Sequence, residues 1–99
     1  MTQPASWQDF LKSGAPNILK ISENARESIL SDGALDNKTK TLMTMLCDAL
    51  LGHDSGVATI ANRARAAGAS EEEIAETIGV AFLMGGLPSL VTGASAFKK

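Results

Sequence analysis

The sequence holds a single histidine, His53, which follows Gly52 at a predicted junction between two helices. An imidazole titrates near neutral pH, so His53 could act as a general acid or base. Alternatively, it is a polar junction residue that bonds a helix end or faces solvent. Asp54 and Ser55 come next, but three consecutive side chains point in different directions and rarely converge on one reacting atom. We therefore do not expect a Ser–His–Asp triad here.

Asp48 is the one carboxylate within an otherwise apolar segment that runs to about Leu51. Burying a charge costs several kcal/mol unless the charge is paired or hydrogen-bonded. Helical spacing puts Asp48 on the stripe that ends at Gly52, next to His53. Asp48 is therefore a candidate to orient or charge-stabilise His53, or to hold a polar ligand. A carboxylate at the rim of an oligomer, or one paired with a basic side chain, fits the same spacing.

The one cysteine, Cys47, excludes an internal disulfide and a cysteine-rich zinc site. No cation lies near it in sequence to lower its pKa, so we expect a small buried hydrophobic residue rather than a reactive thiol. Arg63 and Arg65 flank a predicted polar helix face. We expect both to be solvated, with anion binding at a subunit boundary as the alternative. No metal or cofactor is expected.

Helix start and stop signals recur along the whole chain, and no alternating strand pattern competes with them. Ser6 with Asp9, and Ser70 with Glu73, have the spacing of capping boxes. Other starts are predicted at Pro16, Asp36, Asp54 or Ser55, and Pro88, and ends at Gly14, Gly33, Gly52, Gly68 and Gly85–Gly86. These signals predict an all-α bundle of about six helices. The length predicts one domain, residues 1–99.

Apolar residues recur at helical spacing and form one stripe on each of these helices, and a stripe of this kind is the face that a helix turns inward where neighbours cover it. They are Ile18, Ile21, Ala25 and Ile29; Val57, Ile60, Ala61, Ala64 and Ala67; Ile74, Ile78, Ala81 and Phe82; and Leu90, Val91, Ala94 and Phe97. The helix 37–51 differs, because its apolar residues cover nearly its whole circumference, which indicates burial on all sides. In so small a chain we expect another copy to cover part of it. A well-centred core helix in a monomer is the alternative.

Composition excludes several classes of protein. With 44% hydrophobic residues the chain is not a disordered segment, and its net charge of −2 shows no electrostatic footprint for nucleic acid or an acidic membrane. The longest run of apolar residues and glycine, Ile78–Leu87, is too short to span a bilayer. Residues 1–10 do not resemble a secretory signal, so we expect a cytoplasmic protein.

Three segments in order resemble the carboxymuconolactone decarboxylase family, which includes the AhpD-like (alkylhydroperoxidase D-like) proteins. They are GALDNKTK at 33–40 followed by an apolar helix, RAAGASEEEIAE at 65–76, and GGLP at 85–88. The resemblance implies an all-helical fold that assembles into trimers or hexamers. It also implies a pocket between subunits, near the end of the central helix.

The redox chemistry of that family does not carry over. Its peroxidase branch uses Cys-x-x-Cys-x-x-x-His, with a glutamate twelve residues before the first cysteine. Counting back from Gly68 puts the cysteines at His53 and Gly56, the histidine at Ile60 and the glutamate at Thr41. All four are replaced, and a dithiol cycle needs a thiolate and a resolving thiol. The decarboxylase branch is similar to this chain in fold, but its His and Glu residues around this segment are also replaced.

We therefore expect a non-redox member of the family, a homo-oligomer (trimer or hexamer) that binds or transforms a small organic acid or lactone in an inter-subunit pocket. In a catalytic member, His53 would be the acid or base and Asp48 would orient it. A non-catalytic oligomeric binding or accessory module is the second hypothesis. Peroxidase activity through Cys47, with a thiol from another subunit, is the third.

Overall fold

A computed structural model describes residues 5–98, in which helices and turns occur and no strand does. The all-α class predicted from the sequence is confirmed. The chain divides into two compact units, Met1–Ser31 and Asp32–Lys99, each with its own packing. The single domain expected for residues 1–99 stays a prediction. Every helix in the described part of the chain is too short or too polar to traverse a lipid bilayer.

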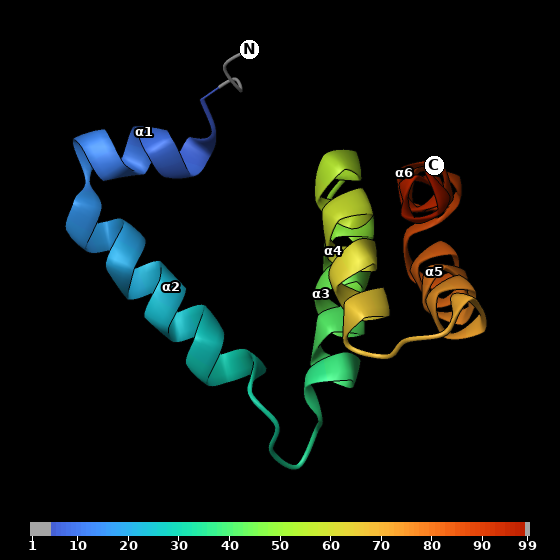
Figure 1. The fold of residues 1–99 in the computed structure, drawn as a ribbon. Helices are drawn as coiled ribbons and strands as arrows, with labels where there is room; N and C mark the ends of the chain where they lie inside the picture. The colour runs from blue at the N-terminus through green and yellow to red at the C-terminus, as the bar shows by residue number, and fades with distance from the viewer. Residues whose placement is uncertain (1–4, 99) are drawn as a thin grey trace. The chain divides into compact units, whose positions relative to one another are not determined.

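The first unit contains α1 (Trp7–Gly14) and α2 (Pro16–Leu30) (Figure 1). Leu19 is the one side chain that these two helices bury. The apolar stripe predicted for α2 lies on a helix but is left uncovered within this unit, because Ile18, Ile21 and Ile29 are more than half exposed. The physical reason is size: two helices offer little surface against which a stripe can be buried.

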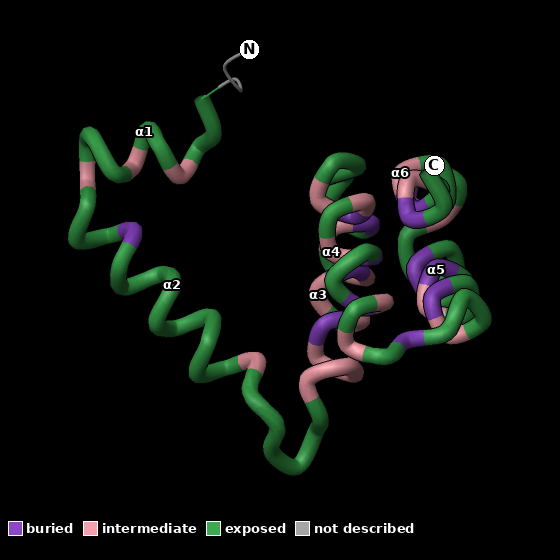
Figure 2. Tube along the Cα trace, in the orientation of Figure 1, coloured by how far each residue is buried: buried purple, intermediate pink, exposed green. Residues whose placement is uncertain are grey.

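The second unit contains α3 (Asn37–Leu50), α4 (Asp54–Ala66), α5 (Glu71–Gly85), α6 (Leu87–Gly93) and a short 3-10 helix, η1 (Ala94–Phe97). Helix α3 packs against α4 and α5 (Figure 1). The 3-10 helix η1 packs against α4. These contacts enclose one cluster of buried residues, and Figure 2 marks the buried positions along the chain. Six of the ten residues in this core cluster are alanine. Small side chains let helices approach closely, which is how so short a chain forms a dry core.

The inward faces predicted for α4 and α5 are largely confirmed. The buried members are Val57, Ala61, Ala64, Ile74, Ile78 and Ala81. Ile60 and Ala67 are partly buried. Phe82 is the exception and is about half exposed, because it lies one helical step beyond Ala81, which takes the inward position. Burial of Phe82 was therefore a wrong prediction.

The predicted helix starts at Ser6, Pro16, Asp36 and Ser70 are confirmed. The starts at Asp54 or Ser55 need correction, because His53 occupies the N-cap position of α4 without a side-chain cap. Asp54 is the first helical residue, and its Oδ1 accepts the Ser55 backbone N–H at 2.9 Å. Helix α2 ends at Leu30, earlier than Gly33.

One face of α3 is exposed. Met45 and Ala49 are buried against α4 and α5, whereas Met43, Cys47 and Leu50 recur at helical spacing on the opposite side and are exposed. A helix at the side of a small unit has neighbours on one side only, so part of the apolar surface of α3 stays uncovered in the single chain, as expected, and the alternative of a well-centred core helix is wrong. The expected burial of Cys47 is wrong for the same reason.

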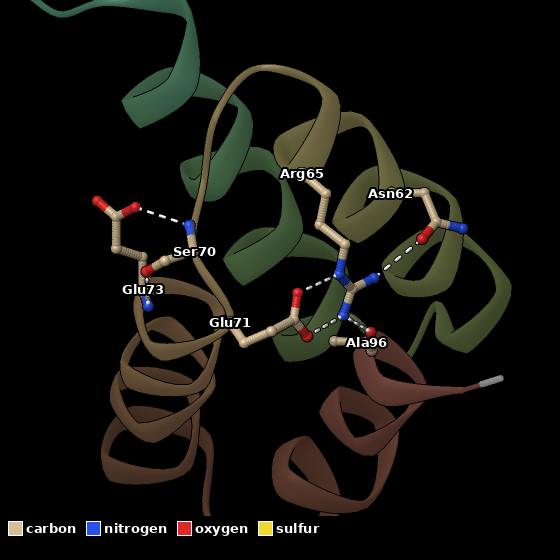
Figure 3. A network of polar contacts seen from close by, with 6 residues as sticks. All are labelled: Asn62, Arg65, Ser70, Glu71, Glu73 and Ala96. Atoms are coloured by element: carbon tan, nitrogen blue, oxygen red, sulfur yellow. Dashed lines mark hydrogen bonds and ion pairs between the residues drawn. The ribbon is translucent and has the colours of Figure 1, made fainter.

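Arg65 is partly buried and paired rather than simply solvated, which corrects the expectation for this residue (Figure 3). Its guanidinium donates to both carboxylate oxygens of Glu71, at 2.6 and 2.8 Å. It also donates to Asn62 Oδ1 at 2.9 Å and to the Ala96 carbonyl at 2.8 Å. The hydrogen bond and the charge of Glu71 raise the pKa of Arg65. One side chain thus joins the end of α4 to the start of α5 and to η1, whereas Arg63 is exposed as expected.

A second ion pair joins the starts of α3 and α5. Lys38 Nζ lies 2.8 Å from Glu73 Oε2. Glu73 is also the third helical residue of α5, and its other oxygen accepts the Ser70 backbone N–H in the capping box. The hydrogen bond from Lys38 is the largest cause that lowers the pKa of Glu73, followed by the bond from Ser70. A local cap and a contact between helices therefore share one carboxylate.

Candidate functional site

The junction between α3 and α4 presents His53 on a fixed backbone. Gly52 reverses the chain with a φ of +79°, a conformation that glycine adopts without strain. The His53 backbone N–H then donates to the Asp48 carbonyl at 2.9 Å, and its own carbonyl accepts the Val57 N–H at 2.9 Å. The residue is therefore hydrogen-bonded to the end of one helix and to the start of the next.

The structure brings the side chains of His53 and Asp48 together. Imidazole Nδ1 lies 3.2 Å from Asp48 Oδ1. The imidazole is 59% exposed and the carboxylate 26% exposed. The pair therefore combines a partly buried carboxylate with an accessible imidazole ring at the junction between the two helices.

The contact constrains which ring nitrogen carries a proton. An ionised carboxylate can only accept hydrogen bonds, so Nδ1 is the donor in this pair. In the neutral imidazole, Nε2 then holds the lone pair. A nitrogen that holds a lone pair and can pick up a proton is what a general base requires.

The other polar residues of the junction do not join the pair. The carboxylate oriented toward His53 is that of Asp48, whereas Asp54 uses Oδ1 to accept the Ser55 backbone N–H. The geometry agrees with the expectation that His53, Asp54 and Ser55 form no triad. No group of three or more His, Cys, Asp or Glu residues in the described part of the chain is arranged to hold a metal ion.

The positions that match the redox motif hold other chemistry. Thr41, at the glutamate position, is buried and donates its hydroxyl hydrogen bond to the Asn37 carbonyl at 2.7 Å. Ile60 is a partly buried residue packed against the core. Gly56 adds no side chain at all. Cys47 lies on the exposed face of α3. In this fold the hydroxyl of Thr41 thus replaces the motif's glutamate, Gly56 without a side chain replaces its second cysteine, and the hydrocarbon side chain of Ile60 replaces its histidine.

Sequence spacing missed one member of the site. Gly56 lies directly beside the carboxylate of Asp48, since a Cβ on Gly56 would fall 2.7 Å from Asp48 Oδ2. The two residues belong to different helices. Their contact depends on how α4 turns back on α3, so no periodicity within one helix could reveal it.

Comparison with known proteins gives one family. The model of the carboxymuconolactone decarboxylase family matches residues 16–99. An uncharacterized protein of Methanocaldococcus jannaschii, MJ1511, is 25% identical over 93 residues, which cover 94% of this chain and 87% of that protein. No solved structure matches significantly. The family match includes α2 and all of the second unit, and it contains the His53 junction, so the chain belongs to the carboxymuconolactone decarboxylase family.

Proposed function

We propose that this protein is a non-redox member of its family that transforms a small organic acid or lactone, with His53 as the acid or base and Asp48 as its orienting partner. The observation that carries the proposal is the contact of 3.2 Å between His53 Nδ1 and Asp48 Oδ1, with the imidazole still largely accessible. A catalytic imidazole needs a partner that orients it and a free nitrogen that meets the substrate. This pair supplies both.

The chemistry follows from the two nitrogens. With Nδ1–H held by Asp48, Nε2 can take a proton from a substrate and return it at another atom. The carboxylate of Asp48 stabilises the imidazolium formed in between, as the acidic member of a catalytic triad does. The imidazolium is complementary to a substrate carboxylate, which supports an acid or a lactone acid as the substrate class.

The proposal includes assembly with further copies of the chain, as trimers or hexamers, and a pocket between subunits. Leu51, two residues before His53, is 68% exposed. Other large apolar side chains are more than half exposed on α5 and α6, namely Leu83, Met84, Leu87 and Val91. Large apolar side chains that are exposed in the single chain become buried where protein interfaces form, and these residues could supply such an interface. A partner copy that covers Leu51 would form one side of a pocket next to His53. A stable monomer in sedimentation at micromolar concentration would contradict the assembly.

The test measures turnover of carboxymuconolactone, the compound that names the family, by release of carbon dioxide. His53→Gln should lower kcat/KM by about 10²–10⁴-fold, the usual contribution of a general acid or base. Asp48→Asn should lower it as well, through loss of orientation. Asp54→Asn is the matched control, because it removes a carboxylate from the same junction without touching the pair.

The oligomer must remain intact in each variant, as checked by sedimentation. Equal turnover by the wild type and His53→Gln would refute the role of His53. Absence of turnover and of binding, for carboxymuconolactone and for a panel of small organic acids and lactones, would refute catalysis altogether.

That second result would support the alternative, a non-catalytic binding or accessory module. One observation favours this alternative: the positions of the redox motif now serve packing, with Thr41 buried and Ile60 against the core. Catalytic positions that have become core positions are compatible with a fold retained for assembly alone.

Peroxidase activity through Cys47 is the third candidate. The thiol is exposed, and the chain has no second cysteine, so a disulfide step would need a thiol from another molecule. Consumption of cumene hydroperoxide that survives in Cys47→Ser would refute this candidate.

A further inference from the structure

Gly56 is the third residue of α4 and lies against the carboxylate of Asp48. A Cβ on Gly56 would stand 2.7 Å from Asp48 Oδ2, 3.0 Å from Cγ and 3.4 Å from Oδ1. The first of these distances is far inside van der Waals contact. A side chain at position 56 and the carboxylate in its present place are therefore mutually exclusive.

The backbones on the two sides cannot easily separate. Ala49, beside Asp48, and Val57, beside Gly56, are both fully buried in the core cluster. Two backbone hydrogen bonds, from His53 N–H to the Asp48 carbonyl and from Val57 N–H to the His53 carbonyl, tie the end of α3 to the start of α4. If a methyl group were added at position 56, the short Asp48 side chain would move rather than either helix, because interiors are close-packed.

We propose that Gly56 is a positioning residue of the His53–Asp48 pair. The missing side chain at position 56 creates the space in which the Asp48 carboxylate lies and accepts the hydrogen bond from Nδ1. Gly56 thereby sets which nitrogen of His53 carries the proton and which faces solvent. The inference deepens the proposed function and rests on it for its catalytic meaning, but the geometry itself can be tested without any substrate.

Gly56→Ala should keep the fold and break the pair. Alanine is a better helix former than glycine, and the group that must yield is the end of a short side chain with access to solvent. The carboxylate should turn toward water, and His53 should lose its fixed tautomer. A merely structural role of Gly56 would change stability and leave the tautomer as it is.

The readout is the long-range proton–nitrogen spectrum of the imidazole, recorded on protein without a histidine tag at a pH where the ring is neutral. His53 is the one histidine of the sequence, so its signals need no assignment. We expect the Nδ1–H form in the wild type. In Asp48→Ala we expect mainly the Nε2–H form, which free imidazole side chains prefer, and Gly56→Ala should shift most of the way toward that spectrum.

Gly79→Ala is the matched control. Gly79 also lies within a helix, and a Cβ there would meet nothing within 4 Å. The spectrum of Gly79→Ala should equal that of the wild type. If Gly56→Ala alone fails to fold, the double variant Gly56→Ala with Asp48→Ala should fold, because the colliding carboxylate is gone.

Three results would overturn the inference: an unchanged tautomer in Gly56→Ala, an Nε2–H form in the wild type, or a double variant that is unfolded while Asp48→Ala is folded. None of them depends on turnover. If the expected tautomers appear but His53→Gln does not alter turnover, the proposed function fails and the positioning by Gly56 stands.

Discussion

Removal of the Arg65 guanidinium should destabilise the second unit by more than its ion pair alone can explain. Arg65→Met keeps most of the aliphatic stem and deletes four hydrogen bonds. The Glu71 side chain is 65% exposed, so loss of that pair costs about 0.2–1 kcal/mol. The Ala96 carbonyl belongs to a buried residue and loses a charged donor, which costs about 1–3 kcal/mol. Together these two contributions predict that Arg65→Met lowers the free energy of unfolding by about 2 kcal/mol.

The assay is urea unfolding followed by far-ultraviolet circular dichroism at one fixed protein concentration, since association would otherwise shift the midpoint. Tryptophan fluorescence is unsuitable, because Trp7 belongs to the first unit. Arg63→Met is the matched control, from an exposed arginine on the same helix, and should change the free energy of unfolding by less than about 0.5 kcal/mol.

Glu71→Gln separates the two contributions. It weakens the ion pair and leaves the bond to the Ala96 carbonyl, so its cost should be about 0.5 kcal/mol. The reasoning is refuted if Arg65→Met costs no more than Arg63→Met. It is also refuted if Glu71→Gln costs as much as Arg65→Met, because the stability would then come from the exposed pair rather than from the buried carbonyl.

Three further predictions concern acid stability, the core and the thiol. The pKa of Glu73 is lowered in the folded state, so its contribution to the free energy of unfolding is fully present above its ordinary pKa of 4.5 and is lost as the pH falls through the pKa of the folded state. On acidification the unfolding midpoint of Glu73→Gln should therefore fall less steeply than that of the wild type. An equal slope would contradict this prediction. Met45→Ala should cost about 2–5 kcal/mol in urea unfolding, since Met45 is fully buried, and a cost under about 1 kcal/mol would contradict the assigned core. Cys47 should react quickly with a thiol reagent in dilute native protein and more slowly as the concentration rises, if copies cover its face; slow reaction at all dilutions would contradict its exposure.

The exposed face of α3 and the exposed stripe of α2 raise the same physical question in each unit. Both are apolar, and in the single chain both are open to solvent. Helical periodicity reports which face of a helix is apolar. It does not report whether the cover comes from the same chain or from another, because the spacing of residues along one helix is identical in either case.

Signals within one helical turn of the sequence determined where several helices begin. The caps at Ser6, Asp36 and Ser70 bond to backbone three residues away, within one turn, so the chain needs no tertiary contact to specify them. Counting along the sequence was likewise enough to exclude a dithiol site within one chain and to place His53 and Asp48 at one junction.

Only the tertiary structure decided what those residues contact. Arg65 reaches the Ala96 carbonyl 31 positions away, and Gly56 meets Asp48 across a reversal of the chain. Such contacts depend on how one helix is rotated against the next, which the packing of many small core residues sets jointly. A stripe on a single helix has no information about that rotation, and for this reason the space beside Asp48 and the partners of Arg65 could not be predicted.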